Sequence, residues 1–253
     1  MLKTGNKKEA ELARPKPHEG LRIFWRRFGA VVAVLAAGTL AHLVGGVLAG
    51  QLLKGISPLL PILGNTEQQF ISYLVSQACI ILLLLCFVQL FKVKWQALGL
   101  GKIKNWTLIL LVPLLYIICV IVSHLLVQGV SEVFPLFDPR QMQDVGLKPT
   151  SQYELVMSGV FLALVVPFVE EFIFRGYLFG LLRRQLPFWL TTLLVSVIFA
   201  ALHGQWNVAI DVFVLSIVLC FLREKTGSIW AGVLLHALKN FVAFLLIYVY
   251  TIM

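Results

Sequence analysis

Long apolar runs recur along almost the whole chain, and they constrain its fold more than any other feature. A helix needs about 20 apolar residues to cross about 30 Å of hydrocarbon. The runs are continuous and do not alternate with polar residues, which favours helices over a β-barrel. The sequence therefore predicts an all-α, polytopic membrane bundle with about seven transmembrane helices. The expected spans are residues 28–53, 69–91, 106–129, 155–182, 187–204, 206–222 and 228–249.

The composition agrees with a membrane protein. Hydrophobic residues make up 59% of the chain and charged residues 13%, against roughly 45–50% apolar residues in a soluble domain. The net charge is +9, but no nucleic-acid-binding motif accompanies it, so we expect no nucleic-acid partner. All four cysteines lie inside apolar segments without CxxC spacing, which indicates neither a structural disulfide nor a thiolate metal site.

The distribution of basic residues predicts how the chain is oriented. Under the positive-inside rule, lysine and arginine gather in cytoplasmic segments. Alternating the seven spans places every basic cluster on one side, with the N-terminus in the cytoplasm and the C-terminus outside. We expect a bacterial plasma membrane. The basic residues concerned are Lys3, Lys7, Lys8, Arg14, Lys16, Arg22, Arg26, Arg27, Lys92, Lys94, Lys102, Lys104, Arg183, Arg184, Arg223 and Lys225.

Three sections follow along the chain. Residues 1–27 form a basic segment that we expect in the cytoplasm or at the membrane interface. Residues 28–150 carry the first three spans and their loops. Residues 151–253 carry the polar groups that could take part in catalysis, and we expect this section to be the catalytic core.

Two adjacent glutamates interrupt the apolar stretch VVPFVEEFIFRGYLFG at residues 165–180. Intramembrane ionisable groups cost a few kcal/mol and are functional candidates by default. Glu171 and Arg175 have the i,i+4 spacing of an ion pair on one helix face, whereas Glu170 is rotated by about 100° from Glu171. Pro167 lacks a backbone donor and can bend the helix. The pattern predicts one paired glutamate and one free to act in a polar cavity; in the structural alternative, both pair with cations of neighbouring helices.

Two later spans add further polar groups. His203 ends the fifth span, and His236 and Asn240 share one face of the last span. A carboxylate and a histidine can activate water for hydrolysis, and a histidine with an amide can stabilise an oxyanion. Two histidines and a glutamate could instead bind zinc, although HExxH spacing is missing. No serine or cysteine is placed as a nucleophile.

These residues resemble the three motifs of the CPBP family, which comprises CAAX proteases and bacteriocin-processing proteins and is also called the Abi family. The motif EExxxR is present as Glu170, Glu171 and Arg175, the motif FxxxH as Phe199 and His203, and the motif HxxxN as His236 and Asn240. The resemblance covers about residues 150–245. It implies an integral membrane hydrolase, an intramembrane endopeptidase that acts in proteolysis on a membrane-bound peptide or protein.

The resemblance also implies roles for the motif residues. Glu170 and His203 would activate water, and His236 and Asn240 would form the oxyanion site. Glu171 and Arg175 would support them. The family is often named an intramembrane metalloprotease, but a mechanism without metal is also argued for it, so the cofactor stays open between none and Zn²⁺ held by Glu170, His203 and His236.

Several alternatives remain at this point. The substrate could be a prenylated CAAX-like protein, a bacteriocin or a signal peptide. A non-catalytic scaffold or bacteriocin immunity protein of the same fold is the main alternative to an enzyme. A proton-coupled transporter is a third, but the sequence shows no duplicated half with matching broken helices.

Two features fit this scheme less well. His203 falls near the outer end of its span, so that helix must start deep, tilt or break after His203, where Gly204 favours a break. Asp211 and Lys239 are intramembrane charges without a family role. For these two we expect snorkelling or mutual pairing.

Overall fold

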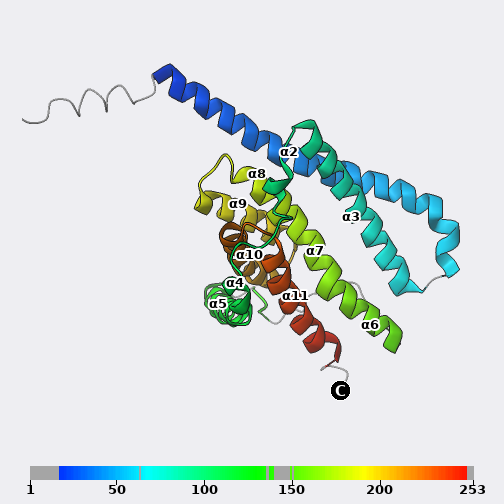
Figure 1. Cartoon of the computed structure of the whole chain (residues 1–253). Helices are drawn as coiled ribbons and strands as arrows, with labels where there is room; N and C mark the ends of the chain where they lie inside the picture. Colours follow the sequence, from blue (N-terminus) through cyan, green and yellow to red (C-terminus); the bar gives the residue numbers. More distant parts are fainter. Residues whose placement is uncertain (1–16, 63, 135–136, 140–148, 150, 250–253) are drawn as a thin grey trace, which may run out of the picture.

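The structure, a computed structural model, describes residues 17–62, 64–134, 137–139, 149 and 151–249. Every regular element in these ranges is a helix (Figure 1). Six helical stretches are long and apolar enough to cross a membrane, which confirms the predicted polytopic bundle. They are Trp25–Leu59, Glu67–Leu90, Val112–Val133, Gln152–Leu182, Trp206–Thr226 and Trp230–Tyr248. The basic residues Lys3, Lys7, Lys8, Arg14 and Lys16 lie outside the described ranges.

The fifth predicted span forms a shorter helix than the others. Helix α9 covers Phe188–Ala201, and its 14 residues give a length of about 21 Å, less than the hydrocarbon thickness. The chain then turns at Gly204, whose φ of 68° lies in the left-handed region that glycine adopts readily. The predicted break beside His203 is therefore present.

Helices α2 (Pro17–Ile56) and α3 (Asn65–Leu90) form an antiparallel hairpin through a 3₁₀ segment, Ser57–Ile62 (Figure 1). Ala41, Gly45 and Ala49 repeat every four residues on α2, and the two alanines are fully buried. A Cβ at Gly45 would lie 2.8 Å from Ile80 Cγ1 of α3. This stripe of small residues lets the two helices approach closely, as is common in membrane bundles.

A single long rod, residues 152–182, crosses the middle of the molecule and carries the glutamate pair. It consists of α6 (Gln152–Val160), a π-helical turn, α7 (Val166–Glu171), a second π-helical stretch and α8 (Gly180–Leu182). The π-helical pieces are Phe161–Val165 and Phe172–Phe179, so they flank the glutamates on both sides. Ser151 caps the rod by accepting a hydrogen bond from the backbone N–H of Glu154 at 3.2 Å.

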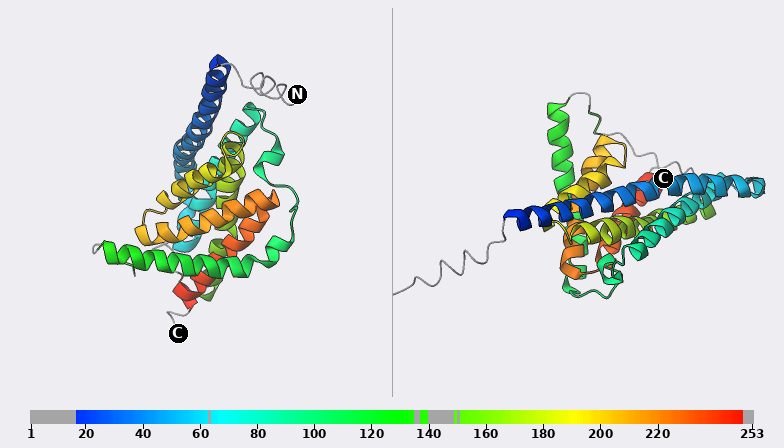
Figure 2. Two further views of the ribbon diagram at one scale, coloured as in Figure 1. Left: turned by 90° about the vertical axis from the view of Figure 1, so that its left-hand side faces the viewer. Right: turned by 90° about the horizontal axis from the view of Figure 1, so that it is seen from above.

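Helices α10 (Trp206–Thr226) and α11 (Trp230–Phe244) complete the wall of the site, and a last π-helical turn, Leu245–Val249, follows α11. Helix α5 (Val112–Val133), preceded by the short α4 (Thr107–Leu110), packs against both on the side away from α3 (Figures 1 and 2).

The loop that precedes α4 contains the 3₁₀ turn Trp95–Leu98 and is fastened to the bundle. Buried Arg223 donates to the carbonyl oxygens of Ala97 at 2.8 Å and Arg175 at 3.2 Å. Ser228 Oγ donates to the carbonyl oxygen of Gly101 at 2.8 Å. These bonds tie the loop to the central rod and to the end of α10.

All four cysteines are free thiols. Cys79, Cys119 and Cys220 are buried free thiols, whereas Cys86 is exposed on α3. Exposed apolar side chains are frequent throughout the described bundle. Such exposure suits contact with lipid.

Candidate active site

The predicted ion pair of the central rod is present and fully buried. Arg175 Nη1 donates to Glu171 Oε1 at 2.8 Å, and neither side chain is exposed. The other guanidinium arm donates to Ser216 Oγ of α10 at 2.7 Å. The spacing argument identified this pair correctly, and Ser216 joins it to a second helix.

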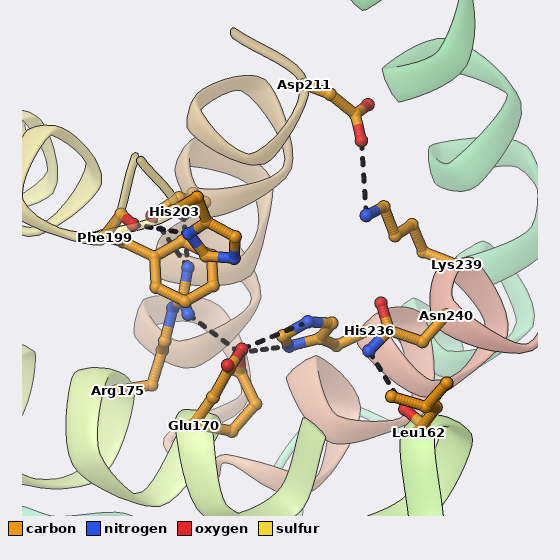
Figure 3. Close-up of polar contacts among 11 residues, drawn as sticks. Leu162, Glu170, Arg175, Phe199, His203, Asp211, His236, Lys239 and Asn240 are labelled. Carbon is orange, nitrogen blue, oxygen red and sulfur yellow. Dashed lines mark hydrogen bonds and ion pairs between the residues drawn. The ribbon is translucent and has the colours of Figure 1, made fainter. Parts of the chain in front are cut away.

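Both ring nitrogens of His236, on α11, lie near glutamates of the rod, and Figure 3 shows the ring beside Glu170. Its Nδ1 is 3.2 Å from Glu171 Oε1, and its Nε2 is 3.6 Å from Glu170 Oε2. An ionised carboxylate can only accept, so Nδ1 is the donor toward Glu171. The Glu170 side chain is 23% exposed and that of Glu171 is 0% exposed. Glu170 is therefore the carboxylate that a water molecule or a substrate can reach.

His203 lies in the turn between α9 and α10. Its Nδ1 donates to the carbonyl oxygen of Phe199 at 2.8 Å, which leaves Nε2 as an acceptor in the neutral ring. Burial lowers the pKa of this imidazole; the charge of Glu170 opposes that effect, and the charges of Lys239 and His236 add to it. No hydrogen bond or ion pair in the described part of the chain joins His203 directly to Glu170.

Phe199, the aromatic position of the FxxxH motif, lies at the centre of these groups. Its ring packs under the Arg175 guanidinium, with Cζ 4.6 Å from the ring centroid. It also meets the rings of His203 at 4.8 Å and His236 at 5.9 Å between centroids. The sequence supplied the motif but no role for this residue. The structure shows that its ring contacts both histidines and packs against the guanidinium of the buried ion pair.

Asn240 donates through Nδ2 to the carbonyl oxygen of Leu162 at 3.0 Å (Figure 3). The rod itself explains why this carbonyl is available. The Val166 N–H bonds to Phe161 in the π-helical turn, and Pro167, the next residue, has no N–H to offer. One amide hydrogen of Asn240 thus completes the backbone bonding of the rod; its role at an oxyanion stays a prediction.

Gly232 is a further residue that sequence reasoning missed. A Cβ at this position would lie 2.6 Å from Glu171 Oε2, so only glycine lets α11 approach the buried carboxylate this closely. A signal was present in the sequence, because Gly232 lies four residues before His236 and thus on the same face of α11. Ser216 gave a weaker signal, as a lone hydroxyl within an apolar run.

No group of three metal-ligating side chains gathers within the described residues. Both nitrogens of His236 face carboxylates of the rod, and His203 Nδ1 is bonded to backbone. The alternative zinc set of Glu170, His203 and His236 is therefore not assembled here as a ligand cluster.

The two intramembrane charges without a family role pair with each other. Lys239 Nζ of α11 lies 3.3 Å from Asp211 Oδ2 of α10 (Figure 3). Mutual pairing was one of the two expectations for these residues, and it is confirmed.

The fold and the site together define a polytopic helical membrane protein in which two glutamates of the rod and a histidine of α11 meet within the bundle. Residues 152–242 match the family model described as "Type II CAAX prenyl endopeptidase Rce1-like". All the motif residues from Glu170 to Asn240 lie inside this segment. The resemblance to the CPBP family predicted from the three motifs is thus confirmed over residues 152–242.

A curated protein matches a shorter stretch. The "Putative membrane peptidase YdiL" of Bacillus subtilis (strain 168) is 31% identical over 78 residues, which are 31% of this chain and 32% of that protein. The chain thus spans about a third of the length of this curated relative. No solved structure matches. The descriptions of both matches name a peptidase.

Proposed function

We propose that this protein is an intramembrane endopeptidase that hydrolyses a peptide bond of a membrane-associated substrate. The proposal rests on one observation: the two carboxylates beside the His236 imidazole differ in their exposure. Glu171 is neutralised by Arg175 in a fully buried pair, while Glu170 stays partly accessible beside His236. A structural ion-pair network alone does not require the accessible carboxylate.

In this mechanism Glu170 acts as a general base on a water molecule, and the neutral Nε2 of His203 helps to orient that water or accept its proton. The water oxygen forms a bond to the carbonyl carbon of the scissile peptide, and the carbonyl oxygen becomes an oxyanion. We assign the stabilisation of that oxyanion to His236, which donates from Nε2 when it carries a proton there as well as on Nδ1, and to the remaining amide hydrogen of Asn240. The proton taken from water then passes to the leaving nitrogen as the C–N bond breaks, so one water yields a carboxylic acid and an amine.

We assign Glu171, Arg175, Ser216 and Phe199 to positioning. The Glu171 carboxylate holds His236 through Nδ1, which directs Nε2 toward Glu170. Arg175 compensates the buried charge of Glu171 and links it to α10. Such support fixes the groups before the substrate binds, which is how hydrolytic sites lower the reorganisation needed during reaction.

For the substrate class we propose a peptide or protein segment held at the bilayer, such as a prenylated CAAX-like protein, a bacteriocin or a signal peptide. The site lies within helices apolar enough to span a membrane. A substrate that partitions into the bilayer is concentrated at such a site.

The experiment that tests the proposal compares membrane peptides from cells that carry either the wild-type protein or Glu170→Gln. Glutamine keeps the shape of glutamate but cannot accept a proton from water. Cleaved termini present with the wild-type protein should disappear with Glu170→Gln and with His203→Ala. Glu132→Gln, at an exposed position on α5, is the matched control and should leave them unchanged. Identical termini in all strains would favour a scaffold or immunity protein and contradict the proposal.

A further inference from the structure

A cavity bordered by two charged residues, Asp211 and Lys239, is not used by the proposed reaction. It has a volume of about 260 Å³ and lies between α5, α10 and α11. Its polar lining includes Tyr116, Asp211 and Lys239, and its apolar walls include Val120, Leu215 and Ala243. The Asp211–Lys239 ion pair thus borders an open space instead of being closed in by packing.

The ion pair leaves much of its hydrogen-bonding capacity unused. Both residues lie within segments long and apolar enough to cross a membrane. An ammonium has three donors and a carboxylate two acceptor oxygens, yet within the described residues each group has only the other as a charged or hydrogen-bonding partner, with Lys239 Nζ 3.3 Å from Asp211 Oδ2. Within the described residues, no hydrogen bond to the Tyr116 hydroxyl is present. Charges in hydrocarbon are costly unless they are solvated, and a cavity with several polar partners can hold ordered water.

The cavity and the site share helix α11, which contributes residues to both. Lys239 follows His236 by three residues and precedes Asn240, so its side chain is rotated by about 60° from the His236 direction. In Figure 3, Lys239 points toward Asp211 beside the labelled His236 and Asn240. Ala243 lies four residues after Lys239, on the same face of α11, and also lines the cavity.

We propose that the Asp211–Lys239 cavity is a water-filled compartment within the bundle and that it supplies the water consumed at Glu170. The second half of this inference rests on the proposed hydrolysis. The first half does not, because hydration follows from the charges, the volume and the polar lining alone. The ligand of this site is a cluster of water molecules held by one carboxylate, one ammonium and one phenol.

Thiol labelling tests the hydration directly. In a variant without Cys79, Cys86, Cys119 and Cys220, a single cysteine replaces either Ala243 or Phe241. Ala243 lines the cavity, whereas Phe241 is exposed on nearly the opposite face of the same helix at similar depth. A membrane-impermeant methanethiosulfonate reacts with thiolate, which forms only where water reaches the sulfur, so Ala243→Cys should react roughly tenfold faster than Phe241→Cys. Equal rates would overturn the proposal.

A double variant that lacks both charges tests the hydration of the cavity and the supply of water to Glu170 separately. Asp211→Asn with Lys239→Met removes both charges together and leaves no single charge unpaired. Its unfolding temperature serves as the folding control. In the Ala243→Cys background this variant should slow labelling roughly tenfold, and with the native residue at position 243 it should lower kcat more than KM. Slow labelling with unchanged kcat would overturn the water supply, and fast labelling of the double variant would overturn the claim that the two charges hold the water. An inactive wild-type protein together with fast labelling of Ala243→Cys would contradict only the proposed peptidase.

Discussion

Two adjacent residues with the same side chain meet different environments in this protein. Successive residues of a helix point about 100° apart, so Glu171 enters the packed interface with α10 and α11 while Glu170 faces a more open side. The exposed fractions of 23% and 0% record this difference. The helix geometry therefore assigns one carboxylate to structure and leaves the other available for chemistry.

The Glu171→Gln substitution should destabilise the protein strongly. It leaves the Arg175 guanidinium buried without its counter-charge, and breaking a buried ion pair from one side costs about 3–5 kcal/mol. Thermal unfolding in detergent should show a marked fall in the melting temperature. Glu170→Gln should unfold close to the wild-type temperature, because Glu170 is partly exposed and lies outside the buried pair. Equal melting temperatures for the two variants would contradict the assignment.

The Gly232→Ala substitution should disturb the same interface through its volume. The added Cβ would lie 2.6 Å from Glu171 Oε2, and overpacking of this kind costs about 1–3 kcal/mol. Gly46→Ala provides the control, since nothing lies within 4 Å of a Cβ at that exposed helical position. We expect lower stability and slower cleavage for Gly232→Ala, with neither change for Gly46→Ala. A fully active, stable Gly232→Ala protein would show that α11 does not approach the rod this closely.

At the scale of elements, the central rod departs from a regular α-helix where the site is built. π-helical segments flank the glutamate pair, and such segments often occur at functional sites. The shift in hydrogen bonding frees the Leu162 carbonyl, which Asn240 of α11 then occupies. The rod and α11 are joined through this irregularity.

A double-mutant cycle tests the link between Pro167 and Asn240. Asn240→Ala leaves the Leu162 carbonyl without its donor, and an unsatisfied buried acceptor costs about 1–3 kcal/mol. Pro167→Ala restores a backbone N–H that can serve the same carbonyl in the π-helical register. The loss of stability caused by Asn240→Ala should therefore be smaller in the Pro167→Ala background. Strictly additive changes in melting temperature would contradict this explanation.

The elements themselves were largely predictable from the sequence. Apolar length locates most span ends within a few residues. The first long stretch ends at Leu59 instead of residue 53, and the third begins at Val112 instead of residue 106. The i,i+4 rule gives the Glu171–Arg175 pair because both partners lie on one helix. The contacts of Arg175 with Ser216 and of Asn240 with Leu162 join residues 41 and 78 positions apart. No local pattern specifies such contacts, because they depend on how whole helices pack.

At the scale of the molecule, the residues of the site lie within the segment that matches the family model, and the α2–α3 hairpin lies outside it. The hairpin is nevertheless attached to the rod, since the Tyr177 hydroxyl donates to the carbonyl oxygen of Val34 at 3.1 Å. The division into an N-terminal section and a catalytic core at residue 151 stays a prediction, as does the orientation of the termini.

The most direct test of the central claim is the cleavage rate of purified protein reconstituted in liposomes with a peptide substrate identified from the membrane comparison. The proposed mechanism predicts that Glu170→Gln abolishes cleavage while its melting temperature stays near that of the wild-type protein, and that Glu132→Gln cleaves at the wild-type rate. Cleavage by folded Glu170→Gln at the wild-type rate would contradict the claim that this carboxylate activates water.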